Sequence, residues 1–278
     1  MKPSTEASRL VLVGSAASKA MSPGLWNPVL QKLGSGWTYE AWDVPPGGDL
    51  AGVRRRLLDP GIVAANVTMP HKHWAAETAD GATDAVRRSG ACNLLVRQGN
   101  ELVGHNTDIT AVSVLLGRQF QRHALLLGAG GAARAVLVAL SGNVGTVSIT
   151  DRDPRAAEEL LALAGSLGVD ARNVTWQQAQ DLARDVSLVV NATPIGKDAS
   201  DAPAWGGKPL APDAVLYDFV YAGHTTASVA RARELGIRSV DGWEHLREQA
   251  VAMVPLLGLD GQARLLLQQT LERLRAAI

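Results

Sequence analysis

Residues 125–133 read Leu-Leu-Leu-Gly-Ala-Gly-Gly-Ala-Ala, so an apolar run of strand length leads directly into a glycine-rich loop. The loop fits the pattern G-x-G-x-x-G/A, with Gly128, Gly130 and Ala133 at the three fixed positions. Gly128 permits a tight turn, Gly130 lets a pyrophosphate approach the backbone, and the small Ala133 lets the next helix pack closely on the strand. The stretch therefore predicts a strand, a turn and a helix whose first amides bind the phosphates of a dinucleotide.

A Gly-rich strand-to-helix turn without a ligand is the alternative interpretation, because one match to this pattern is a weak signal. The strand before the loop, the amphipathic segment 132–140 after it and an acidic residue downstream favour the dinucleotide site. The candidate cofactor-binding residues of the loop are Gly128, Ala129, Gly130, Gly131, Ala132 and Ala133.

The next apolar strand ends at Asp151, roughly 20 residues beyond the loop, where an acid would accept a hydrogen bond from the ribose 2′-hydroxyl. Because a carboxylate repels a 2′-phosphate, we expect NAD to be favoured over NADP. Arg152 and Arg155 stand beside it in the sequence and could instead bind a phosphate or stack on adenine. Asp151 and Asp153 are also suited to cap the helix that follows, and both roles can coexist on one loop.

Apolar runs of strand length alternate with amphipathic segments along the chain, a rhythm typical of parallel sheets covered on both faces by helices. The clearest predicted strands are residues 10–13, 62–67, 125–127, 147–149, 188–190 and 215–219. The predicted fold class is α/β, with an N-terminal α/β domain and a Rossmann-type, doubly wound parallel sheet.

Two domains are expected from a chain of 278 residues, 46% of them hydrophobic. A helical stretch over 110–116 leads to a new strand near residue 124, and the pattern from residue 242 onward is almost purely helical. With no strand left to extend the second sheet, this tail is expected to return to the first domain. We therefore expect a substrate-binding and catalytic domain of residues 1–108 and 243–278, and a dinucleotide-binding domain of residues 109–242.

Composition and charge argue against several classes of partner. The 27 basic residues balance 27 acidic ones, so no global field would attract nucleic acid or an acidic membrane surface. Cys92 is the only cysteine, which excludes an internal disulfide and favours a reducing compartment, and no metal site is predicted. No run approaches the roughly 20 apolar residues that span a bilayer, and the apolar run within residues 1–13 is too brief for a signal peptide. We expect a soluble, cytoplasmic monomer or homodimer that binds a small-molecule substrate.

Four polar clusters interrupt otherwise apolar sequence in the first domain. They are Ser22-Pro23, Asn-Val-Thr-Met-Pro-His-Lys at 66–72, Gly-Ala-Cys-Asn at 90–93 and Asn-Thr-Asp at 106–108. Taken singly, each is a turn or a helix cap. Gathered at strand ends, their hydroxyl and amide groups are what a polyhydroxylated substrate requires.

These clusters, in this order around the glycine loop, resemble those of the shikimate/quinate dehydrogenase family. The match continues with Asn-Ala-Thr-Pro-Ile-Gly at 191–196, Asp-Phe-Val-Tyr at 218–221 and residues 242–249, and it covers about residues 10–257. The resemblance implies an oxidoreductase that transfers a hydride reversibly between a nicotinamide cofactor and a ring hydroxyl of shikimate, quinate or a related cyclohexene or cyclohexane carboxylate. Aromatic amino acid biosynthesis through the shikimate pathway, quinate breakdown and a specialised pathway all stay open.

The resemblance also implies roles for individual residues. Lys72 and Asp108 would form the catalytic dyad, since oxidising a carbinol needs a base for the hydroxyl proton and reducing the ketone needs an acid at the same place. Taken separately, each is as readily a solvated charge. The implied substrate-binding residues are Ser22, Asn66, Thr68, Asn93, Tyr221 and Gln249. The residues implied to join the glycine loop in binding the cofactor are Asp151, Arg152, Thr193, Pro194, Phe219 and Gly242.

The chain departs from the family's pattern at residues 19–23, Lys-Ala-Met-Ser-Pro, where family members usually carry two serines that hold the substrate carboxylate. Ala20 has no hydroxyl, and the loss of one charge-assisted hydrogen bond costs about 1.5 to 3 kcal/mol if nothing replaces it. Trp26 stands where the family commonly has histidine, and Lys19 could supply a replacement charge. We therefore expect a divergent member that binds a shikimate-like or quinate-like acid weakly, or that takes a related ring alcohol.

A protein that senses the nicotinamide dinucleotide without turnover is the main alternative, because the altered first motif could signal lost catalysis. A two-domain dehydrogenase acting on an amino acid or a folate is a third interpretation. The presence of Lys72, Asp108, Asn93 and Gln249 favours the enzyme, since loss of catalysis would more naturally erode the dyad.

Overall fold

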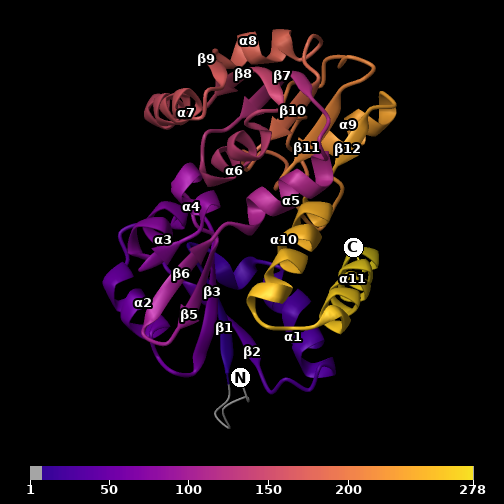
Figure 1. The fold of residues 1–278 in the computed structure, drawn as a ribbon. Helices are drawn as coiled ribbons and strands as arrows, with labels where there is room; N and C mark the ends of the chain where they lie inside the picture. Colours follow the sequence, from indigo (N-terminus) through magenta and orange to yellow (C-terminus); the bar gives the residue numbers. More distant parts are fainter. Residues whose placement is uncertain (1–7, 278) are drawn as a thin grey trace. The chain divides into compact units, whose positions relative to one another are not determined.

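The computed structural model describes residues 8–277, which divide into two compact units (Figure 1). Unit 1 contains the described residues up to Thr107 together with Gln249–Ala277, and unit 2 contains Asp108–Glu248. Residues 1–7 and Ile278, which belong to the expected first domain, lie outside the described residues. Both divisions between the units fall within helices, namely α5 (Thr107–Leu116) and α10 (Gly242–Leu256).

The described part of unit 2 holds a six-stranded sheet in the order β12-β11-β10-β7-β8-β9, with every pairing parallel. Its strands are β7 (Gln121–Leu127), β8 (Val144–Thr150), β9 (Asp170–Asn173), β10 (Leu188–Asn191), β11 (Val215–Asp218) and β12 (Arg238–Val240), and its further helices are α6 (Gly131–Leu140), α7 (Pro154–Ser166), α8 (Trp176–Leu182) and α9 (Ala227–Glu234). The chain winds outward from β7 through β8 and β9, then returns to the other side and continues through β10, β11 and β12. The predicted doubly wound parallel sheet is confirmed, and its switch point lies between β7 and β10.

The side chains of β7 alternate between two buried layers. Ala124 and Leu126 pack with helices α6 and α7, whereas Leu125 and Leu127 pack with helices α8 and α9 on the opposite face. Neither face of the strand meets water, so every position favours an apolar residue. This is why the inner strands β7, β10 and β11 contain apolar runs that could be recognised in the sequence, whereas the edge strand β9 reads Asp-Ala-Arg-Asn.

Unit 1 contains a six-stranded sheet of mixed direction, in the order β2-β1-β3-β5-β6-β4. Strand β1 is parallel to β2 and β3, while β5 is antiparallel to both β3 and β6. The parallel pairing expected throughout therefore fails at β5 and β6, which form a hairpin that the sequence analysis missed. The strands are β1 (Arg9–Gly14), β2 (Thr38–Asp43), β3 (Ile62–Val67), β4 (Gly81–Ala82), β5 (Leu94–Gln98) and β6 (Glu101–His105).

Helices pack on the sheet of unit 1. The helices here are the short η1 (Ala17–Lys19), α1 (Ser22–Lys32), α2 (Leu50–Leu57), α3 (Lys72–Thr78), α4 (Asp84–Ser89) and α11 (Gly261–Ala276). Leu57, Ala75 and Val86 from α2, α3 and α4 join Val11 and Val13 of β1 in one core. Helix α11 packs beside α1, so the predicted return of the helical tail to the first domain is confirmed (Figure 1).

No helix in the described range 8–277 is long and apolar enough to cross a membrane.

Candidate functional site

The glycine loop of unit 2 lies at the switch point of the sheet, between the carboxyl end of β7 and helix α6. Gly128 has a φ of 97°, and a Cβ there would lie 2.9 Å from the carbonyl oxygen of Ala192, so only glycine fits this turn. Gly130 is the N-cap of α6 and supplies no side-chain cap to the helix. A Cβ at Gly130 would meet no atom within 4 Å, so the space beside the N-cap of α6 is open. This arrangement fits a pyrophosphate held by backbone amides.

The carboxylate of Asp151 holds the backbone of this loop. Its Oδ2 accepts a hydrogen bond from the Ala129 amide at 2.6 Å, and its Oδ1 accepts one from the Asp153 amide at 2.8 Å. The cap of α7 is Asp153, whose side chain accepts from the Arg155 amide at 3.0 Å. Arg152 and Arg155 are exposed beside it. Asp151 thus has a structural task at the position where we expected a ribose ligand.

The loop after β10 is held by its own polar side chains. Thr193 donates its hydroxyl hydrogen to Asn191 Oδ1 at 2.6 Å and accepts a hydrogen bond from the Ile195 amide at 3.1 Å, so its hydroxyl shapes the turn. Asn191 also donates to Asp218 Oδ1 at 2.9 Å. Burial raises the pKa of Asp218 to about 6, although hydrogen bonds from Thr226, the Val220 amide and Asn191 oppose that shift. Asn191 and Asp218 are therefore the polar framework behind the exposed Pro194.

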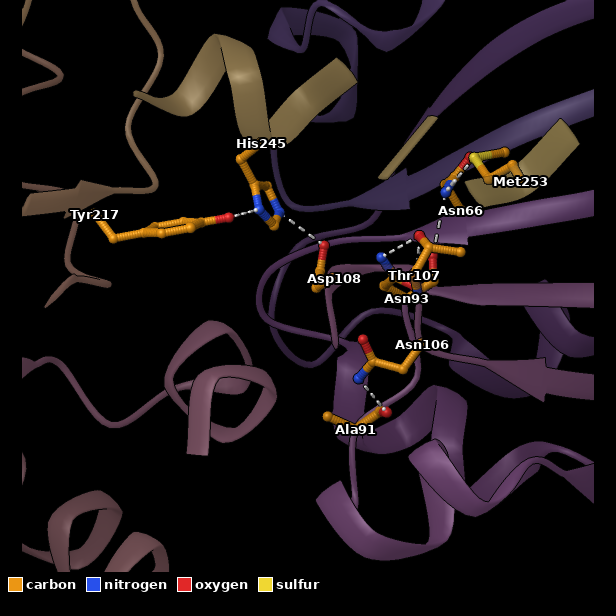
Figure 2. Close-up of polar contacts among 9 residues, drawn as sticks. All are labelled: Asn66, Ala91, Asn93, Asn106, Thr107, Asp108, Tyr217, His245 and Met253. Carbon is orange, nitrogen blue, oxygen red and sulfur yellow. Dashed lines mark hydrogen bonds and ion pairs between the residues drawn. The ribbon is translucent and has the colours of Figure 1, made fainter. Parts of the chain in front are cut away.

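Three side chains of unit 2 form a buried hydrogen-bonded chain that the sequence analysis missed (Figure 2). The hydroxyl of Tyr217 lies 2.7 Å from His245 Nδ1, and His245 Nε2 lies 3.1 Å from Asp108 Oδ1. The Phe219 ring lies against the imidazole, with 4.4 Å between centroids. A signal for His245 existed, because it precedes Gln249 by four residues and so lies on the same side of α10.

Tyr221 and Gly242 meet where the loop after β11 approaches the start of α10. The Tyr221 ring packs on Trp243 with 5.9 Å between centroids. A Cβ at Gly242 would lie 2.4 Å from the carbonyl carbon of Val220 and 2.7 Å from the Tyr221 amide. Glycine at 242 is therefore required by the close approach of two backbone segments.

The polar strand ends of unit 1 are joined by short hydrogen bonds (Figure 2). Asn93 donates to Thr107 Oγ1 at 2.9 Å and accepts from the Thr107 amide at 2.7 Å, and Asn106 donates to the Ala91 carbonyl at 2.8 Å. Asn66 accepts from the Tyr39 hydroxyl at 2.7 Å and donates to the Asn93 carbonyl at 3.3 Å. The structure thus gathers residues of the predicted clusters at 66–72, 90–93 and 106–107 at one end of the sheet of unit 1.

Lys72 is the first residue of α3, and its carbonyl accepts a hydrogen bond from the Cys92 amide at 2.9 Å. This bond fixes the backbone of Lys72 to the segment that carries Asn93. Thr68 is half-buried, and its methyl group occupies the space left by the missing Cβ of Gly14. Lys72 belongs to unit 1 and Asp108 to unit 2.

The altered first motif lies at the start of α1. Ser22 is buried as the first residue of that helix, and Ala20 is half-buried just before it. Trp26 is 1% exposed, so its indole belongs to the core of unit 1. Gln249, in the second half of α10, is half-buried.

Comparisons with known proteins agree with the resemblance. The family model "Shikimate dehydrogenase substrate binding domain" matches residues 12–95. A protein of Brucella abortus named "Shikimate dehydrogenase (NADP(+))" is 36% identical over 239 residues, covering 82% of this chain and 80% of its own. One of Methylobacterium radiotolerans with the same name is 35% identical over 253 residues, covering 87% and 88%.

Two solved structures are similar over nearly the whole chain. The shikimate dehydrogenase of Mycobacterium tuberculosis is 29% identical, with a TM-score of 0.81 over 98% of this chain and 100% of its own. The shikimate 5-dehydrogenase of Thermus thermophilus in complex with NADP(H) and shikimate is also 29% identical, with a TM-score of 0.77 over 95% and 99%.

The expectation that NAD is favoured over NADP is wrong, because these curated relatives are named for NADP(+). The structure accounts for the acid without a ribose ligand. Both carboxylate oxygens of Asp151 accept backbone hydrogen bonds, from Ala129 and Asp153, so an acid at this position is no indication of a ribose ligand.

Proposed function

The chain belongs to the shikimate/quinate dehydrogenase family, and on that premise we propose that it transfers a hydride reversibly between NADP and a ring hydroxyl of shikimate or a related ring carboxylate. It is an oxidoreductase of that family. The observation that carries the proposal is the open glycine loop at the switch point, within a chain that matches NADP(+) shikimate dehydrogenases over 82% and 87% of its length. Relatives named as dehydrogenases do not support the alternative of a non-catalytic sensor.

In this proposal unit 2 binds the dinucleotide. The backbone from Gly128 to Ala133, with the first turn of α6, would hold the pyrophosphate. The exposed Arg152 and Arg155 would pair with the 2′-phosphate, since a guanidinium matches phosphate geometry. Thr193, Pro194, Phe219 and Gly242 would border the nicotinamide half. When bound, the nicotinamide ring supplies or accepts the hydride.

Lys72 and Asp108 perform the proton transfer in this proposal. As the ring alcohol is oxidised, Lys72 Nζ takes the hydroxyl proton, and in the reverse direction it returns a proton to the ketone oxygen. The carboxylate of Asp108 stabilises the positive charge on the lysine. A single residue can serve both directions because the same atom is the base for one and the acid for the other.

Unit 1 binds the substrate in this proposal. Asn66 and Asn93 have most of their capacity committed to Tyr39, Thr107 and backbone groups, so they chiefly hold the pocket's shape. Within residues 8–277, the side chains of Thr68 and Gln249 make no hydrogen bond to the protein, which suits them to ring hydroxyls. Ser22 completes the proposed set in unit 1, and Tyr221 of unit 2 is the remaining proposed substrate-binding residue.

The test is steady-state kinetics with NADP and NAD against shikimate, quinate and amino- or deoxy-ring analogues, followed by the absorbance of reduced nicotinamide. We expect turnover with shikimate or a close analogue, and a lower KM for NADP. Arg152→Ala should raise the KM for NADP roughly tenfold, because it removes a charge-assisted contact, whereas the exposed Arg118→Ala should not. Cofactor binding without turnover on any ring alcohol would contradict the proposal.

A substitution at Ala20 tests how the substrate carboxylate is bound. If the missing hydroxyl weakens binding of the carboxylate, Ala20→Ser should lower the KM for shikimate by about 10- to 150-fold. Ala16→Ser, at an exposed position before the short helix η1, is the matched control and should leave it unchanged. An unchanged KM in Ala20→Ser would show that the carboxylate is bound elsewhere.

A further inference from the structure

The chain from Tyr217 through His245 to Asp108 joins three separate elements of unit 2: strand β11, helix α10 and helix α5 (Figure 2). Tyr217 is 0% exposed, His245 6% and Asp108 4%. Water is thus largely kept from both hydrogen bonds, which strengthens them relative to exposed ones. One end of this chain is the proposed catalytic carboxylate, yet nothing in the proposed reaction assigns a task to Tyr217 or His245.

The direction of donation along the chain follows from its two ends. An ionised Asp108 can only accept, so His245 Nε2–H donates to it, and the neutral imidazole then offers the lone pair of Nδ1. The Tyr217 hydroxyl donates to that nitrogen at 2.7 Å. Burial, reinforced by the negative charges of Asp108, Glu244 and Glu248, raises the pKa of Tyr217, so the phenol keeps the proton that it donates. Each donor polarises the next, toward the carboxylate.

Aromatic packing fixes the plane of the imidazole. The Phe219 ring lies 4.4 Å from it at an interplanar angle of 54°, and the Tyr217 ring lies 5.9 Å from it at 74°. Tyr217 and Phe219 are two residues apart along the β11 segment, so both side chains lie on one side of the backbone and contact each other, with 5.0 Å between centroids. His245 cannot turn its ring without losing two hydrogen bonds and this packing.

We propose that His245 is a positioning residue for the reaction, which holds Asp108 Oδ1 in one orientation and is itself oriented by the Tyr217 hydroxyl. The inference rests on the proposed function, because it matters only if Asp108 takes part in proton transfer. If the Asp108 carboxylate were free to rotate, it would spend part of its time in orientations that do not stabilise the proposed positive charge on Lys72. Holding it therefore acts on the chemical step and leaves the binding of substrate and cofactor nearly unchanged.

The first test separates kcat from KM in a series of variants. His245→Leu should lower kcat roughly 10- to 100-fold, by analogy with the loss of residues that orient metal ligands. The KM values for both substrates should change less than about threefold. Tyr217→Phe, which removes only the hydroxyl, should lower kcat roughly 2- to 10-fold, the effect of one hydrogen bond.

Two amides of different length separate positioning from packing. The side-chain nitrogen of His245→Gln can reach the place of Nε2 and still donate to Asp108, whereas that of His245→Asn reaches only the place of Nδ1. His245→Gln should therefore keep several-fold more activity than His245→Asn. Because Tyr217 acts through the imidazole, adding Tyr217→Phe to His245→Gln should cost little further activity.

The matched control is His123→Gln. His123 is a partly buried histidine of unit 2 that hydrogen-bonds a hydroxyl, with Nε2 2.9 Å from Ser148 Oγ, but it lies in the first half of β7. The glycine loop follows the opposite end of that strand. This variant should keep wild-type kcat and KM, and a thermal melt of every variant identifies any that fails to fold.

A second measurement needs no turnover. Nitrogen-15 NMR of the full chain labelled at its six histidines reports which ring nitrogen carries the proton, and His245→Gln identifies the signal. The expected state of His245 is the Nε2–H tautomer, with an Nδ1 signal that shifts in Tyr217→Phe. The Nδ1–H tautomer, or a His245 signal unaffected by Tyr217→Phe, would overturn the hydrogen-bonded chain.

The two proposals can fail separately. Wild-type turnover together with a folded His245→Leu variant whose kcat lies within about twofold of wild type would overturn the positioning role alone. Equal activity of the Gln and Asn variants would do the same, because packing alone would then explain the residue. No wild-type turnover on any ring alcohol would overturn the proposed function and the positioning role with it, while the NMR result would still decide whether the chain exists.

Discussion

The glycine loop of unit 2 and the polar strand ends of unit 1 differ in which groups carry out the roles that we propose: backbone groups in the loop and side chains at the strand ends. In the loop, the proposed binding surface is the backbone, and Gly128 and Gly130 matter because they lack a side chain. At the strand ends of unit 1, the proposed site is shaped by side chains such as Asn93, which donates to Thr107, and Asn106, which donates to the Ala91 carbonyl. The first kind of site depends on shape, and the second depends on chemical identity.

This difference explains where the chain can diverge. A loop that binds through its backbone tolerates few changes at its glycines and many elsewhere. A site built from side chains can lose one contact and keep the others, and we propose that Ala20, beside the buried Ser22, is such a loss. Divergence in substrate preference is therefore expected in unit 1.

The largest effect should come from a side chain of unit 1. Lys72→Ala removes the proposed acid and base, so kcat should fall by about 10²- to 10⁴-fold. Lys32→Ala, at an exposed position in the last turn of α1, is the control and should leave kcat unchanged. Steady-state rates of both variants test this role. A Lys72→Ala enzyme with near wild-type kcat would show that Lys72 is not the acid and base of the reaction.

The pH dependence of unfolding tests whether the stability of unit 2 also depends on a buried side chain, Asp218. Its folded-state pKa of about 6 lies above its ordinary 3.8, so between these values the folded protein binds more protons than the unfolded chain. The free energy of unfolding should therefore fall as pH rises through this window, by roughly 3 kcal/mol from this group. Urea unfolding of wild type and Asp218→Asn at several pH values measures it, since the variant lacks this titration. Curves that stay parallel from about pH 4 to 6.5 would contradict the expected shift.

Asn93 tests the mutual support of the side chains in unit 1. Asn93→Ala leaves the buried amide of Thr107 without its 2.7 Å acceptor, so the free energy of unfolding should fall by about 1 to 3 kcal/mol. Asn173→Ala, at an exposed end of β9, should change it by less than about 0.5 kcal/mol. If urea unfolding gives the same small change for both variants, the Asn93 network carries little stability.

The smallest effect on stability, with a specific loss of binding, is expected at Gly130. A Cβ there meets no protein atom, so Gly130→Ala should leave the free energy of unfolding within about 0.5 kcal/mol of wild type. It should weaken NADPH binding by about tenfold, because the methyl group occupies the space proposed for the pyrophosphate. Gly165→Ala, an exposed helical glycine of α7 with equally open surroundings, is the control and should bind NADPH normally. Fluorescence titration of NADPH with unchanged affinity in Gly130→Ala would place the phosphates elsewhere.

The sequence predicted those features that depend on local pattern. The apolar strands around Leu125 and Val189, and the turn at Gly128, follow from burial and backbone sterics that act within a few residues. The hairpin of β5 and β6 could have been found from its two-residue Gly99-Asn100 turn, where Gly99 has a φ of 64°. It was missed because a parallel sheet was expected throughout.

What sequence reasoning could not supply was the partner of each polar group. Asp151 has the spacing of a ribose ligand, but its oxygens bind the amides of Ala129 and Asp153, and only three-dimensional geometry shows this. His245 and Tyr217 are 28 residues apart and reach each other from different elements. In the sequence, His245 gives no sign that it contacts a carboxylate 137 residues away.

The most direct test of the central claim is a single-turnover experiment in which enzyme in excess over shikimate is mixed with NADP and the absorbance of reduced nicotinamide is followed. The proposed function predicts a rapid rise that needs both compounds and that is slowed at least 100-fold in Lys72→Ala, the lower end expected for loss of an acid–base group. An enzyme that binds NADPH normally yet gives no rise with shikimate, quinate or their analogues would contradict it.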